Sequence, residues 1–248
     1  MSGRFGRIAG IVAGAVAVAS VAGAVAEQLR EPTSGTLYER FGKRACDIAV
    51  GLTALPVVGA VTAVCGAAIK AEDGGPVFYN APRVGKGGRE FIMYKLRSMK
   101  ENAPDLVMED GSTYNGADDP RMTCVGAFMR KTSLDEIPQF LNILKGDMSL
   151  VGPRPEMMAN VTRYKMDLPS FVYREKMKAG LTGYTQIEGR YNTSAEDKLM
   201  LDMMYIESFS IWLDIKLLLR TFTLLLKPDS TQGFKNSPGS NKNNEKRN

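Results

Sequence analysis

The sequence contains no histidine among its 248 residues. This absence excludes a histidine general base, a histidine-held zinc ion and any Ser-His or Cys-His nucleophile pair. The three cysteines, Cys46, Cys65 and Cys124, are far apart and form no metal or redox motif. Nucleophilic or acid–base chemistry must therefore come from carboxylates, lysine, tyrosine, serine or threonine.

The charge balance shows only a small excess of one sign. The 32 Lys+Arg residues exceed the 27 Asp+Glu residues and give a formal charge of +5. Such a mildly basic chain is compatible with anionic lipid, phosphate ligands or nucleic acid. No nucleic acid partner is expected, because no DNA- or RNA-binding signature accompanies the charge. The length allows one sizeable domain with appendages.

The first long apolar run, residues 8–26, carries no charge and is mostly alanine, valine and glycine. At 1.5 Å per residue such a helix just spans a hydrocarbon core of about 30 Å. Arg4 and Arg7 before the run, and small residues at its end, are also typical of a signal peptide. We favour an uncleaved anchor. A cytoplasmic location for the downstream chain is favoured by the next basic residues, Arg30, Arg40, Lys43 and Arg44.

The second apolar run, residues 48–69, has Pro56 near its middle. Proline removes a backbone donor and kinks a helix, so the run could be a kinked transmembrane helix. It could also be a re-entrant hairpin that enters and leaves by one face, or a buried helix of a soluble core. Lys43 and Arg44 precede the run and Lys70 follows it. Basic flanks on both sides favour the re-entrant arrangement.

Downstream of the apolar runs the pattern is that of a mixed globular domain. Two short apolar stretches between Gly and Pro residues, Val77–Tyr79 and Phe91–Tyr94, predict a β-hairpin. Helices are predicted at 195–206 and 210–226, and the second could lie in a membrane interface or in the core. Residues 229–248 are rich in Ser, Asn, Lys and Gly and are expected to be disordered.

The run Ser133-Leu134-Asp135-Glu136 has two interpretations. Ser-x-x-Glu is the spacing of a helix capping box, but Pro138 would then fall inside the helix, where its missing N–H breaks a hydrogen bond. If Asp135 is the cap, Pro138 falls in the tolerated first turn and both carboxylates stand at a positive helix end. That end attracts phosphate, so the pair could serve capping or chemistry.

Basic residues accompany the Asp-Glu pair along the chain, and the one between two prolines is held by a stiff backbone. The set is Arg83, Lys95, Arg97, Arg130, Lys131 and Arg154. Arginine suits bidentate recognition of phosphate, and Mg²⁺ needs few protein carboxylates when phosphates complete its shell. Ordinary surface charge is the alternative, and spacing alone does not decide between them.

A longer sequence match favours a chemical role for the Asp135-Glu136 pair. The run KTSLDEIPQFLNILKGDMSLVGPRPE resembles the signature of the bacterial sugar transferase family, the monotopic polyprenyl-phosphate phosphoglycosyl transferases. The resemblance covers roughly residues 38–226. It continues in KRACDIAVG, GGPVFYNAPRVGKGGREFIMYKLRSM, DPRMTCVGAFMR, AGLTGYTQIEGR and LDMMYIESFSIWLDIKLLLRTF. The chain departs from the family pattern at Leu55 and Ala179, where the family often has serine and proline.

The resemblance implies an α/β-type membrane-associated domain, with a re-entrant helix hairpin and interfacial amphipathic helices around a small catalytic domain. It places the protein at the bacterial plasma (inner) membrane, with the catalytic domain on the cytoplasmic face. The implied boundaries are an apolar anchor segment and linker at 1–37, a hairpin at 38–72 that breaks at Pro56, a catalytic domain at 73–228 and a disordered tail at 229–248.

The resemblance also implies roles for individual residues. Asp135 matches the family's catalytic nucleophile, and Glu136 matches the residue that helps to hold Mg²⁺. Positions expected to face phosphates are matched by Lys95, Arg97, Arg130 and Arg154, and Asp147 also matches a family position. The choice of sugar could involve Gln186, Glu188 and Arg190, with a purely structural loop as the alternative.

The implied activity is transfer of a sugar-1-phosphate from a UDP-sugar to undecaprenyl phosphate through a covalent aspartyl-phosphosugar, with release of UMP and with Mg²⁺ as cofactor. It would be the first membrane step of exopolysaccharide, capsule or glycoconjugate assembly. The implied surroundings are the lipid bilayer and other glycan-assembly enzymes, and a homo-oligomer is compatible with them. The alternative is a non-catalytic membrane scaffold in a glycan-assembly complex. The identity of the sugar does not follow from the sequence.

Overall fold

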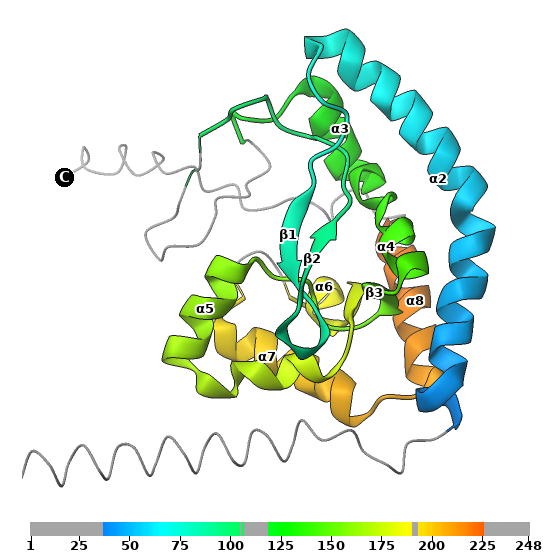
Figure 1. The fold of residues 1–248 in the computed structure, drawn as a ribbon, viewed down its shortest axis with the longest axis vertical. Coiled ribbons are helices and arrows are strands. Elements are labelled where there is room, and N and C mark those ends of the chain that lie inside the picture. The colour runs from blue at the N-terminus through cyan, green and yellow to red at the C-terminus, as the bar shows by residue number, and fades with distance from the viewer. Residues whose placement is uncertain (1–36, 105, 107–118, 190–192, 226–248) are drawn as a thin grey trace, which may run out of the picture. The chain divides into compact units, whose positions relative to one another are not determined.

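The computed structural model describes helices around two small β-sheets (Figure 1). The apolar anchor expected at 8–26, the tail expected at 229–248 and Arg190 lie outside the described residues. The described residues are 37–104, 106, 119–189 and 193–225.

The helices alternate with short strands along the chain. The α-helices are α2 (Lys43–Asp73), α3 (Cys124–Thr132), α4 (Gln139–Lys145), α5 (Met158–Asp167), α6 (Tyr184–Ile187), α7 (Ala195–Glu207) and α8 (Ile211–Leu225). Shorter helical turns are η1 (Tyr38–Gly42), η2 (Lys86–Gly88), η3 (Leu134–Glu136) and η4 (Pro169–Lys176). The helices predicted at 195–206 and 210–226 are confirmed as α7 and α8.

The predicted β-hairpin is present, but its first strand lies further along the chain. Strands β1 (Ala81–Val84) and β2 (Glu90–Met93) pair antiparallel from Ala81 opposite Met93 to Val84 opposite Glu90. The turn uses Gly87 and Gly88, both with positive φ, and closes with a hydrogen bond from Gly85 N to Arg89 O of 2.8 Å. This turn fixes the register, so the first strand predicted at Val77–Tyr79 contributes only a bridge, from Phe78 to Leu96.

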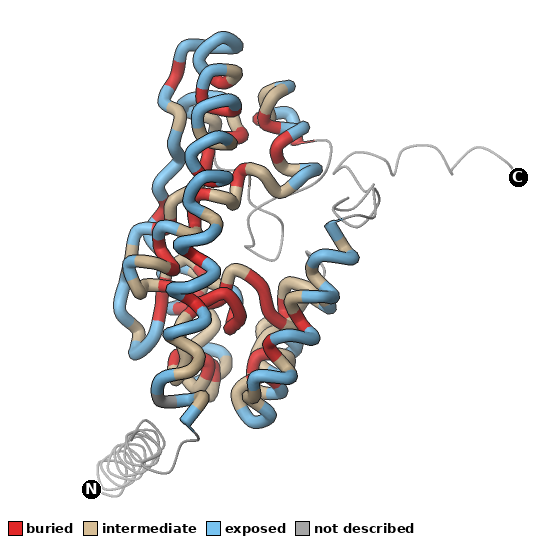
Figure 2. Tube along the Cα trace, turned by 90° about the vertical axis from the view of Figure 1, so that its right-hand side faces the viewer, coloured by how far each residue is buried: buried red, intermediate tan, exposed pale blue. Residues whose placement is uncertain are grey.

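The main core forms where the second sheet meets the helices. Strands β3 (Met148–Val151) and β4 (Ala179–Thr182) pair in parallel, and every residue of β3 is buried. Figure 2 shows stretches of buried residues in the interior of the fold, surrounded by helices whose outer positions are exposed. The buried residues of this core are Met93, Ile143, Met148, Leu150, Val151, Tyr205 and Leu217. A mixed helix-and-sheet domain is thus confirmed.

Helix α2 is the one described helix that is long and apolar enough to cross a membrane. Only 17% of its most apolar 18-residue window is buried in protein, which excludes the interpretation as a core helix. The helix runs through Pro56 without interruption and bends along its length (Figure 1). The expected break at Pro56 is therefore not confirmed.

Both ends of α2 are fixed to the rest of the described fold. Near its start, Arg44 donates to the carbonyls of Ile143 and Leu144 at 2.6 and 2.8 Å, at the last turn of α4. Buried Asp47 accepts from Ser149 Oγ at 3.0 Å and Leu150 N at 2.9 Å, in β3. The other end holds α3 and the segment after β2. Between these ends, the outer side of α2 exposes apolar residues such as Leu52, Val57 and Val64.

Helix α8 has one buried side and one exposed apolar side. Asp214 and Leu217 face the protein and are buried. Asp214 accepts from Tyr38 Oη, Tyr205 Oη and Lys43 Nζ, each at 2.7 Å. The outer face of the same helix exposes a stripe of large apolar side chains: Ile211, Trp212, Ile215, Leu219, Phe222 and Leu225.

Candidate active site

The Asp-Glu pair lies in a short 3₁₀ turn between α3 and α4. Ser133 has a left-handed backbone (φ 56°), ends α3 with a hydrogen bond to Arg130 O, and makes no side-chain cap. Helix α4 begins after Pro138, also without a side-chain cap. The capping box is therefore absent, and Asp135 does not cap α4. Both carboxylates are available for other contacts.

Asp135 is 2% exposed, yet its carboxylate is not neutralised by hydrogen bonds. Lys95 Nζ lies 2.9 Å from Oδ2 as an ion pair, and Oδ2 accepts no hydrogen bond of good geometry from the described residues. The same ammonium lies 3.3 Å from Glu136 Oε1. The backbones are joined as well, since Leu96 N donates to Asp135 O at 2.9 Å. One lysine thus bridges two neighbouring carboxylates.

Burial and charge shift the two carboxyl groups in opposite directions. Burial raises the pKa of Asp135 above its usual value, and the attraction of Lys95 offsets this only in part. Burial also acts to raise the pKa of Glu136, but Lys95, Arg154 and Arg130 outweigh it and lower that pKa. Burial opposes the charge of Lys95, while Glu136 and Asp135 together raise its pKa. The site thus holds one carboxyl group with a raised pKa beside one with a lowered pKa.

Two of the predicted phosphate ligands gather at this pair. Arg130 comes from the last turn of α3, and Arg154 is exposed between Pro153 and Pro155 after β3. The charges of both act on Glu136, and Arg130 also acts on Asp135. The structure therefore brings Lys95, Arg130 and Arg154 together with the Asp-Glu pair. Their contact with phosphate stays a prediction.

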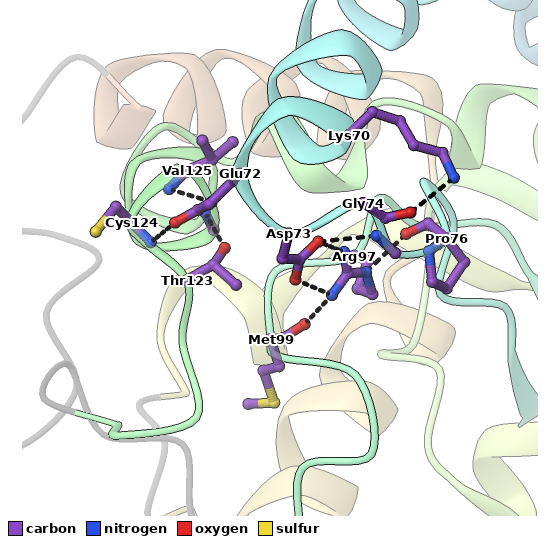
Figure 3. A network of polar contacts seen from close by, with 12 residues as sticks. Lys70, Glu72, Asp73, Gly74, Pro76, Arg97, Met99, Thr123, Cys124 and Val125 are labelled. Atoms are coloured by element: carbon purple, nitrogen blue, oxygen red, sulfur yellow. Dashed lines mark hydrogen bonds and ion pairs between the residues drawn. The ribbon is translucent and has the colours of Figure 1, made fainter.

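Arg97 is used differently from its neighbours. Its guanidinium is buried, donates from Nη1 and Nη2 to Asp73 at the end of α2, and donates further to the carbonyls of Pro76 and Met99 at 2.6 and 3.0 Å (Figure 3). Glu72, next to Asp73, accepts from Cys124 N at 2.6 Å and so holds the start of α3. Arg97 ties the long apolar helix to the site segment, and the structure shows it engaged by protein rather than facing Glu136.

The remaining predicted residues are not brought to the pair by any described contact. Asp147 forms an ion pair with Lys145 at 3.1 Å and lies 3.4 Å from Asn142 Nδ2, at the end of α4. Gln186 donates from Nε2 to Gly180 O at 3.1 Å, while its Oε1 is buried without a partner among the described residues. Their roles in substrate binding stay predictions.

Arg83 belongs to the basic set that the sequence offered for phosphate binding, but the sequence gave it no individual role. It lies in β1, and its charge interacts with those of Glu136 and Arg154. Its Nη1 atom is buried without a hydrogen-bond partner among the described residues. The sequence shows a basic residue at the edge of a predicted hairpin, but its spacing does not predict the direction of the Arg83 side chain.

The donor set limits how a metal ion could be held. The described residues contain no group of three or more His, Cys, Asp or Glu side chains. Mg²⁺, however, keeps water and phosphate ligands and needs only one or two carboxylates. Glu136, with a side chain 33% exposed and a lowered pKa, fits that requirement. The residues present therefore fit a metal that arrives with phosphate.

Together these features are those of a phosphate-handling site in a domain with a membrane-compatible helix. A carboxylate pair amid cations suits phosphate chemistry, and it lies in a domain attached to a long exposed apolar helix. The bacterial sugar transferase family matches residues 38–228, and the chain belongs to it.

Named relatives agree with this family. The chain is 39% identical over 189 residues to the UDP-N-acetylgalactosamine-undecaprenyl-phosphate N-acetylgalactosaminephosphotransferase of Aeromonas hydrophila, covering 75% of this chain and 44% of that protein. It is 40% identical over 195 residues to the UDP-glucose:undecaprenyl-phosphate glucose-1-phosphate transferase of Escherichia coli K12, covering 77% and 41%. A Caulobacter vibrioides protein named for the same glucose reaction is 36% identical over 195 residues, covering 76% and 71%. The chain spans about two fifths of the length of the first two.

Proposed function

We propose that this chain is a phosphoglycosyl transferase that moves a sugar-1-phosphate from a UDP-sugar to undecaprenyl phosphate. The observation that carries the proposal is the buried Asp135 carboxylate, which is paired with Lys95 beside Glu136. The relatives named above support the substrate classes, because each is named for a nucleotide sugar and undecaprenyl phosphate. They differ in the sugar, so the sugar is not assigned.

The proposed chemistry has two displacements at one phosphorus atom. An Asp135 carboxylate oxygen attacks the sugar-linked phosphorus, the P–O bond to UMP breaks, and UMP leaves with the bonding electrons. An oxygen of the lipid phosphate then attacks the same phosphorus and releases the carboxylate. The products are UMP and a lipid diphosphate sugar. Carboxylate nucleophiles are an established way to divide such a transfer into two easier steps.

The electrostatic obstacle is the approach of one anion to another. Two unit charges 4 Å apart repel by about 4 kcal/mol at an effective dielectric near 20. Lys95, Arg130 and Arg154 offset that repulsion and stabilise charge that develops at the phosphorus. When bound, Mg²⁺ would supply further charge neutralisation on the phosphate oxygens, with Glu136 as the residue that would hold it.

The two ends of α2 support a proposal for the membrane arrangement. Its 31 residues would extend about 46 Å at 1.5 Å per residue, more than a hydrocarbon core of about 30 Å. One end is bonded to α4 and β3, and the other to α3 and Arg97. Because one domain holds both ends, both ends of α2 lie on the same side of the bilayer, and a bend in the helix would let its apolar middle enter and leave by that side. We therefore propose a re-entrant segment at 38–72 and a catalytic domain at 73–228 on the cytoplasmic face of the inner membrane.

The test is UMP release from the full chain in lipid nanodiscs, with Mg²⁺, undecaprenyl phosphate and a panel of UDP-sugars. We expect one or a few donors to yield UMP, and Asp135→Asn to reduce the rate by at least about a thousandfold, since removing a nucleophile leaves only positioning and electrostatics. Asp167→Asn, at an exposed carboxylate of α5, is the matched control and should behave as wild type.

A covalent adduct gives an independent readout. Without acceptor, wild type should gain the mass of one phosphosugar, and Asp135→Asn should not. Turnover near the wild-type rate in Asp135→Asn would contradict the assignment of Asp135 as the nucleophile. No UMP from any donor, in a folded protein, would favour the scaffold role instead.

A further inference from the structure

Arg83 combines a buried guanidinium edge with the lack of a protein acceptor. Its Nη1 atom is buried and has no hydrogen-bond partner among the described residues. Buried polar groups in folded proteins are nearly always hydrogen-bonded, because an unmet donor keeps its full desolvation penalty. A charged donor left in this state needs an explanation, and an acceptor that arrives with a ligand is one.

The nearest acidic group does not fulfil this need. Glu156 is the strongest attractive charge on Arg83, but its carboxylate is held by Lys198 Nζ at 3.2 Å. Burial lowers the pKa of Arg83, and the charge of Arg154 lowers it further. The guanidinium is thus held in place without a full counter-charge.

The backbone fixes Arg83 at the side of the candidate active site. Its neighbour Val84 donates from N to Glu156 O at 2.9 Å, which joins β1 to the stiff segment that carries Arg154. Arg83 itself is paired with Phe91 of β2, two residues before the end of that strand. Strand β2 leads directly to Lys95. Arg83 therefore stands on rigid backbone between the segments that carry Arg154 and Lys95.

The net charge of the site also favours a phosphate ligand. Lys95, Arg83, Arg130 and Arg154 all interact with Glu136. Glu156 is paired with Lys198, so the two carboxylates of Asp135 and Glu136 stand against these four cations, which leaves an excess of two positive charges. An excess of that size complements a doubly charged diphosphate, and arginine is the side chain best suited to hold phosphate oxygens by two N–H groups.

We propose that Arg83 is a further substrate-binding residue, whose buried Nη1 edge donates to a phosphate oxygen of the substrate beside Arg154. This deepens the proposed function and rests on it. The two substrates share this chemistry, since the nucleotide sugar carries a diphosphate and the lipid acceptor a phosphate. The experiment therefore measures binding of the nucleotide and of the lipid acceptor separately.

The experiment measures affinity for UDP and thermal stability on the full chain in nanodiscs. UDP binding is followed by calorimetry with Mg²⁺ and without acceptor, and the KM for undecaprenyl phosphate is taken from UMP release. In Arg83→Met we expect UDP to bind about tenfold to a hundredfold more weakly, the effect of losing a charge-assisted hydrogen bond. Its Tm should not fall, because Nη1 has no partner among the described residues to lose.

Two further variants make the result specific. Arg83→Lys keeps the charge but not the planar edge, and should lie between wild type and Arg83→Met. Arg89→Met removes an exposed arginine from the same hairpin and should match wild type in affinity and Tm. A raised KM for undecaprenyl phosphate with unchanged UDP affinity would support the phosphate contact and assign it to the acceptor.

Other outcomes overturn the inference. Unchanged UDP affinity and unchanged acceptor KM in Arg83→Met would show that no substrate phosphate is contacted. A lower Tm with wild-type UDP affinity and acceptor KM would show that the guanidinium serves the fold. A folded wild-type protein that binds no UDP would contradict the proposed function itself, and so is distinguishable from a failure of Arg83 alone.

Discussion

At the scale of single residues, the site depends on two adjacent carboxyl groups whose pKa values are shifted in opposite directions. Burial dominates at Asp135 and raises its pKa, whereas the cations dominate at Glu136 and lower its pKa. A buried, under-solvated carboxylate is a better nucleophile than a fully hydrated one, and a well-paired carboxylate is a better metal ligand. Environment thus assigns different tasks to two similar side chains.

The pH dependence of activity should report the Lys95 contact. Asp135 must be ionised to attack, so activity should fall as pH falls through its raised pKa. Lys95 lowers that pKa, and Lys95→Met should therefore move the acid limb of kcat/KM for UMP release to higher pH. We also expect a rate loss on the order of a hundredfold at neutral pH, because a positioned cation is removed.

The control for this prediction is Lys100→Met, which removes an exposed lysine five residues further along the same segment. It should leave the pH profile unchanged. An acid limb that stays in place in Lys95→Met would mean that Asp135 does not control it, and the ionisation would have to be assigned elsewhere.

At the scale of elements, the end of α2 acts as a clamp on the site. Glu72 holds the first N–H groups of α3, and Asp73 holds Arg97, which follows the lysine of the ion pair by two positions (Figure 3). Helix α3 in turn ends at Ser133, directly before the Asp-Glu turn. The long apolar helix therefore sets the position of both segments that form the Lys95–Asp135 pair.

This clamp gives Arg97 and Arg154 opposite expected phenotypes. Arg97→Met removes the hydrogen bonds to Asp73, Pro76 and Met99 and should lower Tm by several degrees, while the folded protein keeps UDP affinity within about threefold. Arg154→Met, at an exposed side chain, should keep its Tm and lose UDP affinity by about tenfold or more. Calorimetry with UDP and a thermal melt on both variants measure the pattern.

Each variant is the other's control in this comparison. Weaker UDP binding with an unchanged Tm in Arg97→Met would mean that Arg97 contacts phosphate, as the family resemblance implies. The same result in Arg97→Met and Arg154→Met would remove the distinction drawn from the structure.

Local pattern predicted the elements better than it predicted the contacts. Helical spacing placed α7 and α8, because their apolar faces repeat within each element. The first hairpin strand was displaced since its register depends on a glycine turn, and the capping box failed since Ser133 adopts a left-handed backbone. The Asp-Glu pair and Lys95 were found through the family motif. The partner of Arg97 was not, because Asp73 is 24 residues away and no periodicity links them.

At the scale of the whole molecule, two apolar surfaces need a partner other than water. One is the exposed middle of α2, and the other is the outer stripe of α8, where Trp212 is 77% and Leu219 63% exposed. Exposed apolar stripes of this kind mark membrane or protein contacts. Aromatic side chains such as tryptophan are enriched at membrane interfaces. We therefore expect α8 to lie in the interface of the same bilayer that holds α2.

The single tryptophan of the chain allows a direct test, since all tryptophan fluorescence comes from α8. In nanodiscs that contain brominated lipid, Trp212 emission should be quenched most strongly by bromines near the headgroup end of the acyl chain. The control moves the probe: Trp212→Phe combined with Met166→Trp places it on exposed α5, on the domain part that packs against η4 and β1. That emission should not respond to brominated lipid. Equal quenching at both positions would show that contact is not confined to α8, and no quenching at Trp212 would leave its apolar stripe to a protein partner.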